Sequence, residues 1–453
     1  MVKLREKRFP INFSFTLLIP PSIMKIVFAP RQATLYDQWI TFPVREDYRI
    51  IDQALEDESF IWQLAQDFPE AATGRNRTPV EQTLRFSFLK HHRGLSYREL
   101  AHTLSVNHED RWFCKIAGTS PCFKTLQNQL SCISEATGKK INDLIVQKAR
   151  AEGKTKGRKL RLDSTVSEAS VRYPTDANLL ADGIRVITRI VTQLKLVPQK
   201  GYRTFARIVK RLLYVKRTIG RKSKEAREKA TAALMAIAQH VVDHTKDVAD
   251  QAVQDFRGVT QRVIDQTERV LAGVQKIPDR IVSVFETYAR PIKKGKLGVS
   301  TEFGRLVQVQ EDEAFITNWH IQEHPDDAGY LPEAMKEHER IHHKPPGEAA
   351  FDRGYHSSKN EKLLVSKVVH FILPEKKGRS PTGAPPVTRK EKELFKWRSG
   401  SEATISLGKR KYGLKKSRYK GYYGYARGIA MGFIAQNRGL GMPAPDNRTG
   451  QMD

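Results

Sequence analysis

The chain has 453 residues, which is enough to bury a sizeable core and to form two or three domains. It carries 78 Lys and Arg against 50 Asp and Glu, and this net charge of +28 favours a polyanionic partner, either nucleic acid or an anionic membrane surface. The composition therefore favours a protein that binds a polyanion. The alternative is a soluble basic protein with no such partner.

The N-terminus begins with basic residues followed by an apolar stretch at 11–29, like a signal peptide. Pro20-Pro21 interrupts this stretch, and no later stretch is long and apolar enough to span a membrane. A second methionine, Met24, follows, so we interpret the first 23 residues as an upstream extension of the reading frame or a disordered arm, within an N-terminal arm at 1–45. No membrane partner is expected.

Three cysteines, Cys114, Cys122 and Cys132, lack any Cys-x2-Cys spacing. We predict that they are reduced, mostly buried thiols of a cytoplasmic protein, and that they form no zinc site.

Residues 46–153 are predicted to form a helical domain. Tyr48 to Phe68 has apolar residues at helical spacing, Thr78-Pro79 starts a second helix, and Ser96 and Ser120-Pro121 start two more. Several short helices with sharp turns favour a helix-turn-helix-like DNA-binding module, with an all-helical scaffold as the alternative.

Residues 154–176 are predicted to contain a strand, because Lys159 to Val171 alternates in polarity after a basic link. From Ala177 to about Ala289, apolar residues recur at three- and four-residue steps, which predicts a long helical insertion at 177–290. Its middle, Arg203 to Lys229, is strongly basic, with eleven Lys and Arg.

Strand patterns return in residues 291–410, beginning with a hairpin whose turn is predicted at Glu311-Asp312-Glu313. The overall class is therefore α/β (mixed α+β), followed by a basic, Tyr-rich C-terminal region at 411–453. The predicted elements are strands at Phe303–Gln310, Ala314–Ile321, Glu348–Asp352 and Val368–Leu373, helices at Leu331–Ile341, Asn360–Ser366 and from Arg389 onward, and a Pro/Gly-rich basic loop at Lys376–Val387.

Three acidic residues stand out. Asp163 follows the run Leu160-Arg161-Leu162, and Asp352 follows the apolar run Ala349-Ala350-Phe351. Glu402 belongs to the pattern aromatic-x2-Arg-x3-Glu-x6-Lys, and on a helix Arg398, Glu402 and Lys409 would fall on nearly one stripe. A carboxylate between two cations suits a divalent metal beside a nucleic-acid phosphate.

The set Asp163, Asp352 and Glu402 resembles the acidic triad of DDE transposases from bacterial insertion sequences. The resemblance runs from about Leu160 to the C-terminal region and includes Asp163-Ser164-Thr165-Val166-x-Glu168-Ala169, Tyr173-Pro174-Thr175-Asp176, Asp352-Arg353-Gly354-Tyr355 and the Arg398/Glu402/Lys409 signature, with Phe395 where the family usually has Tyr. It implies a ribonuclease H-like catalytic core with a mixed sheet. It also implies cutting and joining of double-stranded DNA, at element ends recognised through terminal inverted repeats and at the target, by at least a homodimer.

Phosphodiester transfer needs its developing charge stabilised and its nucleophile deprotonated, and two Mg²⁺ ions about 3.5–4 Å apart can do both. Mg²⁺ prefers carboxylate oxygens, and Mn²⁺ can substitute for it. In this assignment Asp163 bridges both metals, while Asp352 and Glu402 each complete one, so no protein general base is required.

Arg398 and Lys409 are predicted to bind phosphate. No acidic residue occurs from Ala403 to Pro445, where cations are interleaved with tyrosines that can stack on unpaired bases. The alternative is a solvated basic tail. The further predicted DNA-binding residues are Arg410, Lys415, Lys416, Arg418 and Lys420.

Three pairs of histidines lie four residues apart, His240/His244, His320/His324 and His338/His342, and we interpret them as ordinary surface residues rather than zinc ligands. Two functions compete with a transposase. One is a catalytically silent DNA-binding protein derived from such an element, against which the intact triad argues. The other is a stand-alone DNA nuclease using the same carboxylates.

Overall fold

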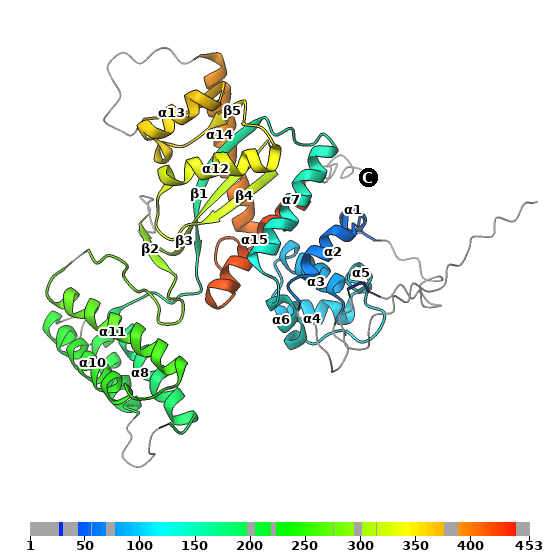
Figure 1. Cartoon of the computed structure of the whole chain (residues 1–453). Coiled ribbons are helices and arrows are strands. Elements are labelled where there is room, and N and C mark those ends of the chain that lie inside the picture. Colours follow the sequence, from blue (N-terminus) through cyan, green and yellow to red (C-terminus); the bar gives the residue numbers. More distant parts are fainter. Residues whose placement is uncertain are drawn as a thin grey trace, which may run out of the picture. The chain divides into compact units, whose positions relative to one another are not determined.

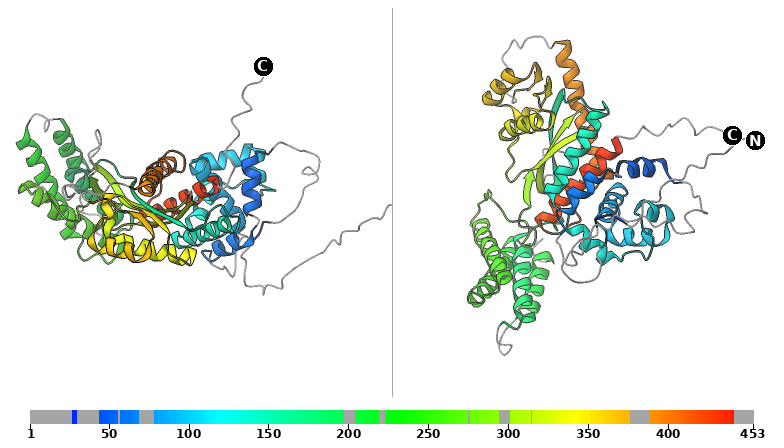
Figure 2. Two further views of the ribbon diagram at one scale, coloured as in Figure 1. Left: turned by 90° about the horizontal axis from the view of Figure 1, so that it is seen from above. Right: turned by 45° about the vertical axis from the view of Figure 1, so that its right-hand side comes forward.

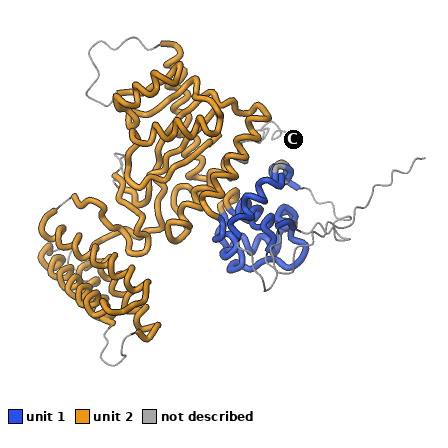
Figure 3. The backbone as a smooth tube through the Cα atoms, in the orientation of Figure 1, with its two compact units in different colours: residues 1–90, 95–133 blue, residues 91–94, 134–453 orange. Residues whose placement is uncertain are grey.

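The structure is a computed structural model that describes residues 27–29, 44–55, 57–68, 78–196, 204–218, 223–274, 276–293, 301–313, 315–375 and 388–440. The chain divides into two compact units, residues 1–90 with 95–133, and residues 91–94 with 134–453 (Figure 3). The first 23 residues, the loop predicted at Lys376–Val387 and the last 13 residues lie outside the described residues.

The first unit is built from short helices. The segment Tyr48–Phe68, predicted as one helix, forms two, because the Asp57 carboxylate accepts a hydrogen bond from the Ser59 amide (2.9 Å) and starts a second helix there. Ser96 starts a helix as predicted, through a capping box with Glu99. The helices are α1 (Glu46–Leu55), α2 (Glu58–Ala65), α3 (Val80–His92), α4 (Tyr97–Val106), α5 (His108–Phe113) and α6 (Phe123–Ser131).

The cysteine prediction was partly wrong. All three thiols are free, but only Cys114 is buried, while Cys122 and Cys132 are exposed. Cys122 and Cys132 flank the short helix α6, which buries only Leu126 and Leu130, so the ends of that helix remain open to solvent.

The second unit contains a six-stranded mixed sheet within its described residues, seen at the centre of Figure 1. The strand order is β2-β3-β1-β5-β6, and β4 also pairs with β3. β1 is antiparallel to β3 but parallel to β5, and β5 is parallel to β6. The strands are β1 (Lys159–Glu168), β2 (Arg290–Lys293), β3 (Thr301–Asp312), β4 (Phe315–Ile321), β5 (Glu348–Ala350) and β6 (His370–Ile372).

Alternation along β1 decides what each face of the sheet receives. Leu160 and Leu162 join a buried apolar cluster with residues of α12 (Asp327–His342) and α13 (Ser358–Lys367). Arg161 and Asp163, which point to the other face, make their contacts with α14 (Arg389–Lys411). One strand therefore contributes an apolar side to the core and a charged side to a helix.

The charged side of the sheet is also covered by α15 (Gly421–Leu440). Its residues Tyr425, Ile429 and Phe433 are buried with Val309 and Trp319 of the sheet. α7 (Glu135–Ala151) packs on β4 and α15 as well: Asn142 donates hydrogen bonds to the Ile316 and Thr317 carbonyls (3.0 and 3.1 Å). The predicted helical domain ended at 153, whereas the compact units divide at residue 133, so α7 belongs to the unit that holds the sheet.

The turn predicted at Glu311-Asp312-Glu313 is shorter than expected. β3 continues through Asp312, and Glu311 and Asp312 are both fully buried. Glu311 meets Arg161, and Asp312 accepts a hydrogen bond from the Gly157 amide (2.7 Å), so distant partners keep these acids in the strand. The turn begins at Glu313, which has a φ of 54°.

The helical insertion forms a bundle of four described helices that share one buried apolar core. They are α8 (Asp176–Gln193), α9 (Ala206–Thr218), α10 (Lys224–His244) and α11 (Gln251–Leu271). The two views of Figure 2 show green helices of this bundle side by side. Among the described helices of the whole chain, none has a stretch long and apolar enough to cross a membrane.

Candidate active site

The parallel pairing of β1 with β5 brings two of the predicted carboxylates to matching positions. Arg161 pairs with Ala350, and Asp163 and Asp352 each follow two residues later. Neighbouring strands lie about 4.8 Å apart, and residues two apart share a face, so the aspartates are placed as neighbours on one face of the sheet.

The third carboxylate lies on α14, which is helical through both Gly400 and Gly408. A Cβ on Gly400 would lie 2.8 Å from Nη1 of Arg161, and one on Gly408 would lie 2.6 Å from Cδ1 of Leu414. Glycine in a helix interior is normally unfavourable, but at these two positions it allows close approach to Arg161 and Leu414. The helix prediction for this segment is confirmed, and Arg398, Glu402 and Lys409 share one stripe of it.

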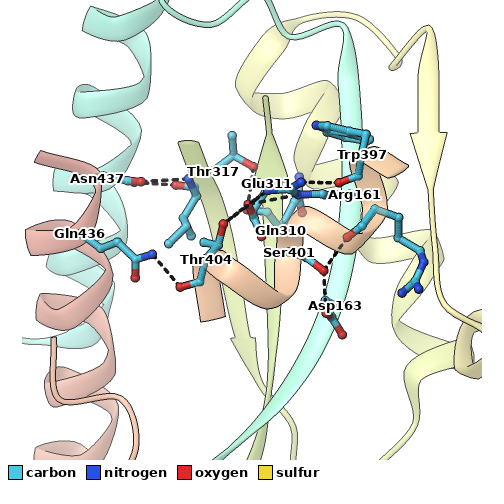
Figure 4. A network of polar contacts seen from close by, with 12 residues as sticks. Arg161, Asp163, Gln310, Glu311, Thr317, Trp397, Ser401, Thr404, Gln436 and Asn437 are labelled. Atoms are coloured by element: carbon cyan, nitrogen blue, oxygen red, sulfur yellow. Dashed lines mark hydrogen bonds and ion pairs between the residues drawn. The ribbon is translucent and has the colours of Figure 1, made fainter. Parts of the chain in front are cut away.

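α14 contacts both aspartates. The Ser401 hydroxyl donates to Oδ2 of Asp163 (2.7 Å), as Figure 4 shows, and Nη1 of Arg398 lies 4.0 Å from Oδ1 of Asp352. Arg398 therefore lies close to Asp352.

Glu402 follows Ser401 directly and is exposed. Among the described residues, the structure gives its carboxylate no hydrogen bond and no ion pair. No group of three or more His, Cys, Asp or Glu within the described chain is close enough to hold one metal ion. Asp163, Asp352 and Glu402 thus lie on three elements in mutual contact without converging on one point.

A further carboxylate, Asp327, was missed by the sequence analysis. It is the first residue of α12, accepts hydrogen bonds from Gln308 and from the Ser164 hydroxyl (3.4 Å), and lies against Gly354, where a Cβ would be 2.8 Å from its Oδ2. Gly354 is therefore needed for room beside Asp327. Acidic residues are common in the first turn of a helix, so the sequence position of Asp327 does not mark it as a site residue. Only its neighbours in the structure do.

The electrostatics of this group favour binding of a cation. Burial raises the pKa of Asp163, and the negative charge of Asp352 adds to the increase, against hydrogen bonds from Ser401 and the Ser164 amide. Burial likewise raises the pKa of Asp327, with smaller contributions from Asp163 and Asp352. The carboxylates repel one another across the site, and a divalent cation would relieve that repulsion.

A buried ion pair holds α14 onto the sheet beside this group (Figure 4). Nε of Arg161 donates to Oε2 of Glu311 (3.1 Å), Nη1 of Arg161 donates to the Trp397 carbonyl (2.6 Å), and the Thr404 hydroxyl donates to Glu311 (2.9 Å). Burial raises the pKa of Glu311 to about 7, although Arg161 opposes the increase. The network links β1, β3 and α14 and so fixes the helix that carries Ser401 and Glu402.

The predicted DNA-binding cations are largely accessible. Lys409 is partly buried, whereas Arg410 in the same last turn of α14 and the cations that follow the helix are exposed, namely Lys415, Lys416, Arg418 and Lys420. The predicted stacking role was wrong for Tyr412 and Tyr425, which are buried, and the Tyr425 hydroxyl donates to the Ser167 carbonyl (2.7 Å). Tyr423, with 87% of its surface exposed, remains available for a base.

Two histidines predicted at the surface are fully buried. His338 and His342 lie on α12 with ring centroids 4.5 Å apart, and His342 Nε2 is 3.7 Å from Oδ2 of Asp312. Burial lowers the pKa of His338 to about 3 and also lowers that of His342. Both rings are therefore neutral at pH 7 and belong to the packing around Gly157, against which His342 lies.

Residues 37–129 match a family model described as "Transposase domain (DUF772)". The chain therefore carries a transposase domain in the region predicted to bind DNA, and this supports a transposase function in general. Comparisons with curated proteins and with solved structures give no match.

Proposed function

We propose that this chain is a DDE-type transposase that binds the terminal inverted repeats of an insertion sequence and catalyses DNA cleavage and strand transfer. The transposase domain at 37–129 supports the general activity. The order of strand, helical insertion, hairpin, helix, strand, helix, strand and helix in the second unit supports a ribonuclease H-like core.

One observation carries the chemistry: Asp163 and Asp352 each lie two residues beyond the last pair of the parallel strands β1 and β5, and α14 contacts both beside Glu402. The donor set is all oxygen, which suits Mg²⁺ or Mn²⁺. We propose that Asp163, Asp352 and Glu402 hold the metal, which would stabilise developing charge on phosphate and lower the pKa of a bound water. Glu402, exposed and without a described partner, is able to turn toward the aspartates.

The surrounding residues would prepare the site. The Ser401 hydroxyl donates a hydrogen bond to Oδ2 of Asp163, and Arg398 lies close to Asp352. Both carboxylates would therefore be oriented before a ligand binds. When DNA enters, Arg398 has the fork geometry to contact a phosphate oxygen, and Lys409 on the same stripe adds a point charge. The exposed cations from Arg410 to Lys420 would then extend the contact along the backbone.

The test uses the full chain and duplex DNA carrying short inverted repeats found beside the gene. We expect cleavage at the repeat ends with Mg²⁺ or Mn²⁺ and none with chelator. Asp163→Asn, Asp352→Asn and Glu402→Gln should each abolish cleavage while DNA affinity is retained. Glu393→Gln, an exposed acid on the same helix, is the matched control and should cleave normally. Full activity in any of the first three variants would overturn the assignment.

The catalytically silent alternative is favoured by one observation: no described group of acids converges on a metal position. Binding of repeat DNA with no cleavage under any metal would support that alternative. Cleavage without joining to a second duplex would instead indicate a stand-alone nuclease. A homodimer is expected on paired ends, and light scattering with and without repeat DNA tests this.

A further inference from the structure

Helix α9 of the insertion has two very different faces. Val209 is buried in the core of the bundle, and Phe205, Leu212 and Leu213 pack against it. These residues recur at three- and four-residue steps, so one side of α9 helps to hold the four helices together, although Ile208 beside it is 42% exposed.

The opposite face of α9 is a stripe of cations. Arg207, Lys210, Arg211 and Arg217 recur at helical spacing around Tyr214, and all five are exposed, Tyr214 to 60%. In the sequence, no Asp or Glu occurs from residue 183 to residue 224. The stripe is therefore a run of like charge with no acidic residue in its own helix.

Several other cations of the same bundle are paired with acids. Arg185 pairs with Asp182 (2.7 Å), and Lys229 and Lys224 pair with Glu225 and Glu228 (2.7 and 3.8 Å). Within the described residues, none of the four cations of the α9 stripe has an ion pair. Like charges three or four residues apart destabilise a helix by about 0.2–0.5 kcal/mol per pair, so such a stripe is unfavourable unless an anion is bound to it.

We propose that this face of α9 binds the phosphate backbone of duplex DNA, as a contact surface separate from the transposase domain and the acidic site. The stripe rises about 15 Å from Arg207 to Arg217, at 1.5 Å per residue, which lets several side chains reach one groove edge. Tyr214 provides a hydroxyl able to donate to phosphate. The contact is independent of sequence, because only backbone groups are addressed.

An anionic membrane is the less favoured partner. Membrane-surface helices insert an apolar face, whereas most apolar side chains of α9 pack on the core of the bundle, with Ile208 as an exposed exception. The exposed face offers charge and a tyrosine, which suit a polyanion in water.

The test measures the salt dependence of binding to random-sequence duplex DNA, in chelator so that cleavage cannot contribute. Each phosphate contact adds about 0.9 to the slope of log affinity against log salt. The variant Arg207→Gln/Lys210→Gln/Arg211→Gln should therefore lose about 2.7 from that slope and bind at least about tenfold more weakly at 0.1 M salt. Glutamine is a good helix former, and circular dichroism should be unchanged.

The matched control is Arg185→Gln/Lys224→Gln/Lys229→Gln, which removes the same charge from paired cations of the same bundle. It should change the slope by less than about one. An equal loss in both variants, or no loss in the α9 variant, would overturn the proposal.

A photo-crosslinking amino acid at position 214 gives a second readout, which should label DNA in the wild-type background. Absence of labelling would contradict DNA as the partner. So would an α9 variant that binds DNA as the wild type does but loses binding to phosphatidylserine vesicles. The Asp163→Asn variant should keep the wild-type slope, so failure of the chemistry and failure of this surface are distinguishable.

Discussion

Two acidic residues on the same face of the sheet, Glu311 of β3 and Asp163 of β1, have opposite surroundings. Arg161 lies opposite Glu311 on β3, while Asp163 lies opposite the apolar Val309. Glu311 is buried but has a guanidinium and a hydroxyl as partners. Asp163 has only hydroxyl and amide hydrogen-bond donors; two more carboxylates, Asp352 and Asp327, lie near it, and the charge of Arg398 is the smaller, opposing contribution. The negative charge of Glu311 is balanced by Arg161 and stabilises the fold. The negative charge around Asp163 is not balanced in this way, so a bound cation is needed to balance it.

The largest expected effect breaks the compensated position. Arg161→Met leaves Glu311 buried without its partner, which should cost about 3–5 kcal/mol of local stability. Native-state hydrogen exchange of β1 and β3 amides measures this loss. The double variant Arg161→Met/Glu311→Leu should recover most of it, because an apolar pair can replace a buried ion pair. A loss of stability below about 1 kcal/mol in the single variant would show that the ion pair is not important for the structure.

A smaller loss is expected where α14 touches this pair most closely. Gly400→Ala would place a Cβ 2.8 Å from Nη1 of Arg161, so the helix or the guanidinium must move. We expect a cost of about 1–3 kcal/mol, read from the same amides. Gly258→Ala in α11 is the control: open space surrounds that position, and the change should stabilise by roughly 0.5–1 kcal/mol. Equal effects at both glycines would show that close packing at Gly400 is unimportant.

Buried titratable groups extend the comparison to pH. Burial lowers the pKa of His338 from 6.5 to about 3, so the unfolded chain binds the extra proton first and stability falls as pH drops below 6.5. Burial raises the pKa of Glu311 from 4.5 to about 7, so stability from this group falls as pH rises between those values. Each slope should reach about 1.4 kcal/mol per pH unit, with opposite sign.

Variants separate the two slopes. Urea unfolding between pH 5 and 6.5 should become less sensitive to acid in His338→Gln and more sensitive to acid in Glu311→Gln. If the free energy of unfolding depends on pH in the same way for the wild type and both variants, neither group has the shifted pKa given above.

The smallest expected effect concerns Ser401, which we treat as a positioning residue. Ser401→Ala removes a donor to Asp163, so the pKa of that carboxyl should rise further and cleavage should fall about tenfold. The acidic limb of the pH–rate profile should move to higher pH, which a purely structural loss would not produce. Ser399→Ala, on the exposed side of the same turn, is the control. An unchanged profile in Ser401→Ala would show that the hydroxyl does not tune Asp163.

Local patterns were sufficient for much of the fold. Alternation around Leu160 and Leu162 predicted β1, and helical spacing predicted the insertion and α14. The sequence analysis failed where partners are far away in the chain. Glu311 and Asp312 have the composition of a turn, and only contacts with Arg161 and Gly157, about 150 residues earlier, show that they are buried strand residues. Asp327 resembles any acid at a helix start until Ser164 and Gln308 are seen beside it.

The most direct test of the central claim is Mn²⁺ binding by the full chain on repeat DNA, followed by loss of the free-ion electron paramagnetic resonance signal and corrected for DNA alone. The account predicts that the wild-type chain takes up Mn²⁺ and that Asp163→Asn and Asp352→Asn each abolish this uptake. Asp265→Asn, an exposed acid of α11, should bind as the wild type does. Undiminished Mn²⁺ uptake in both site variants would contradict the assignment of these aspartates as metal ligands.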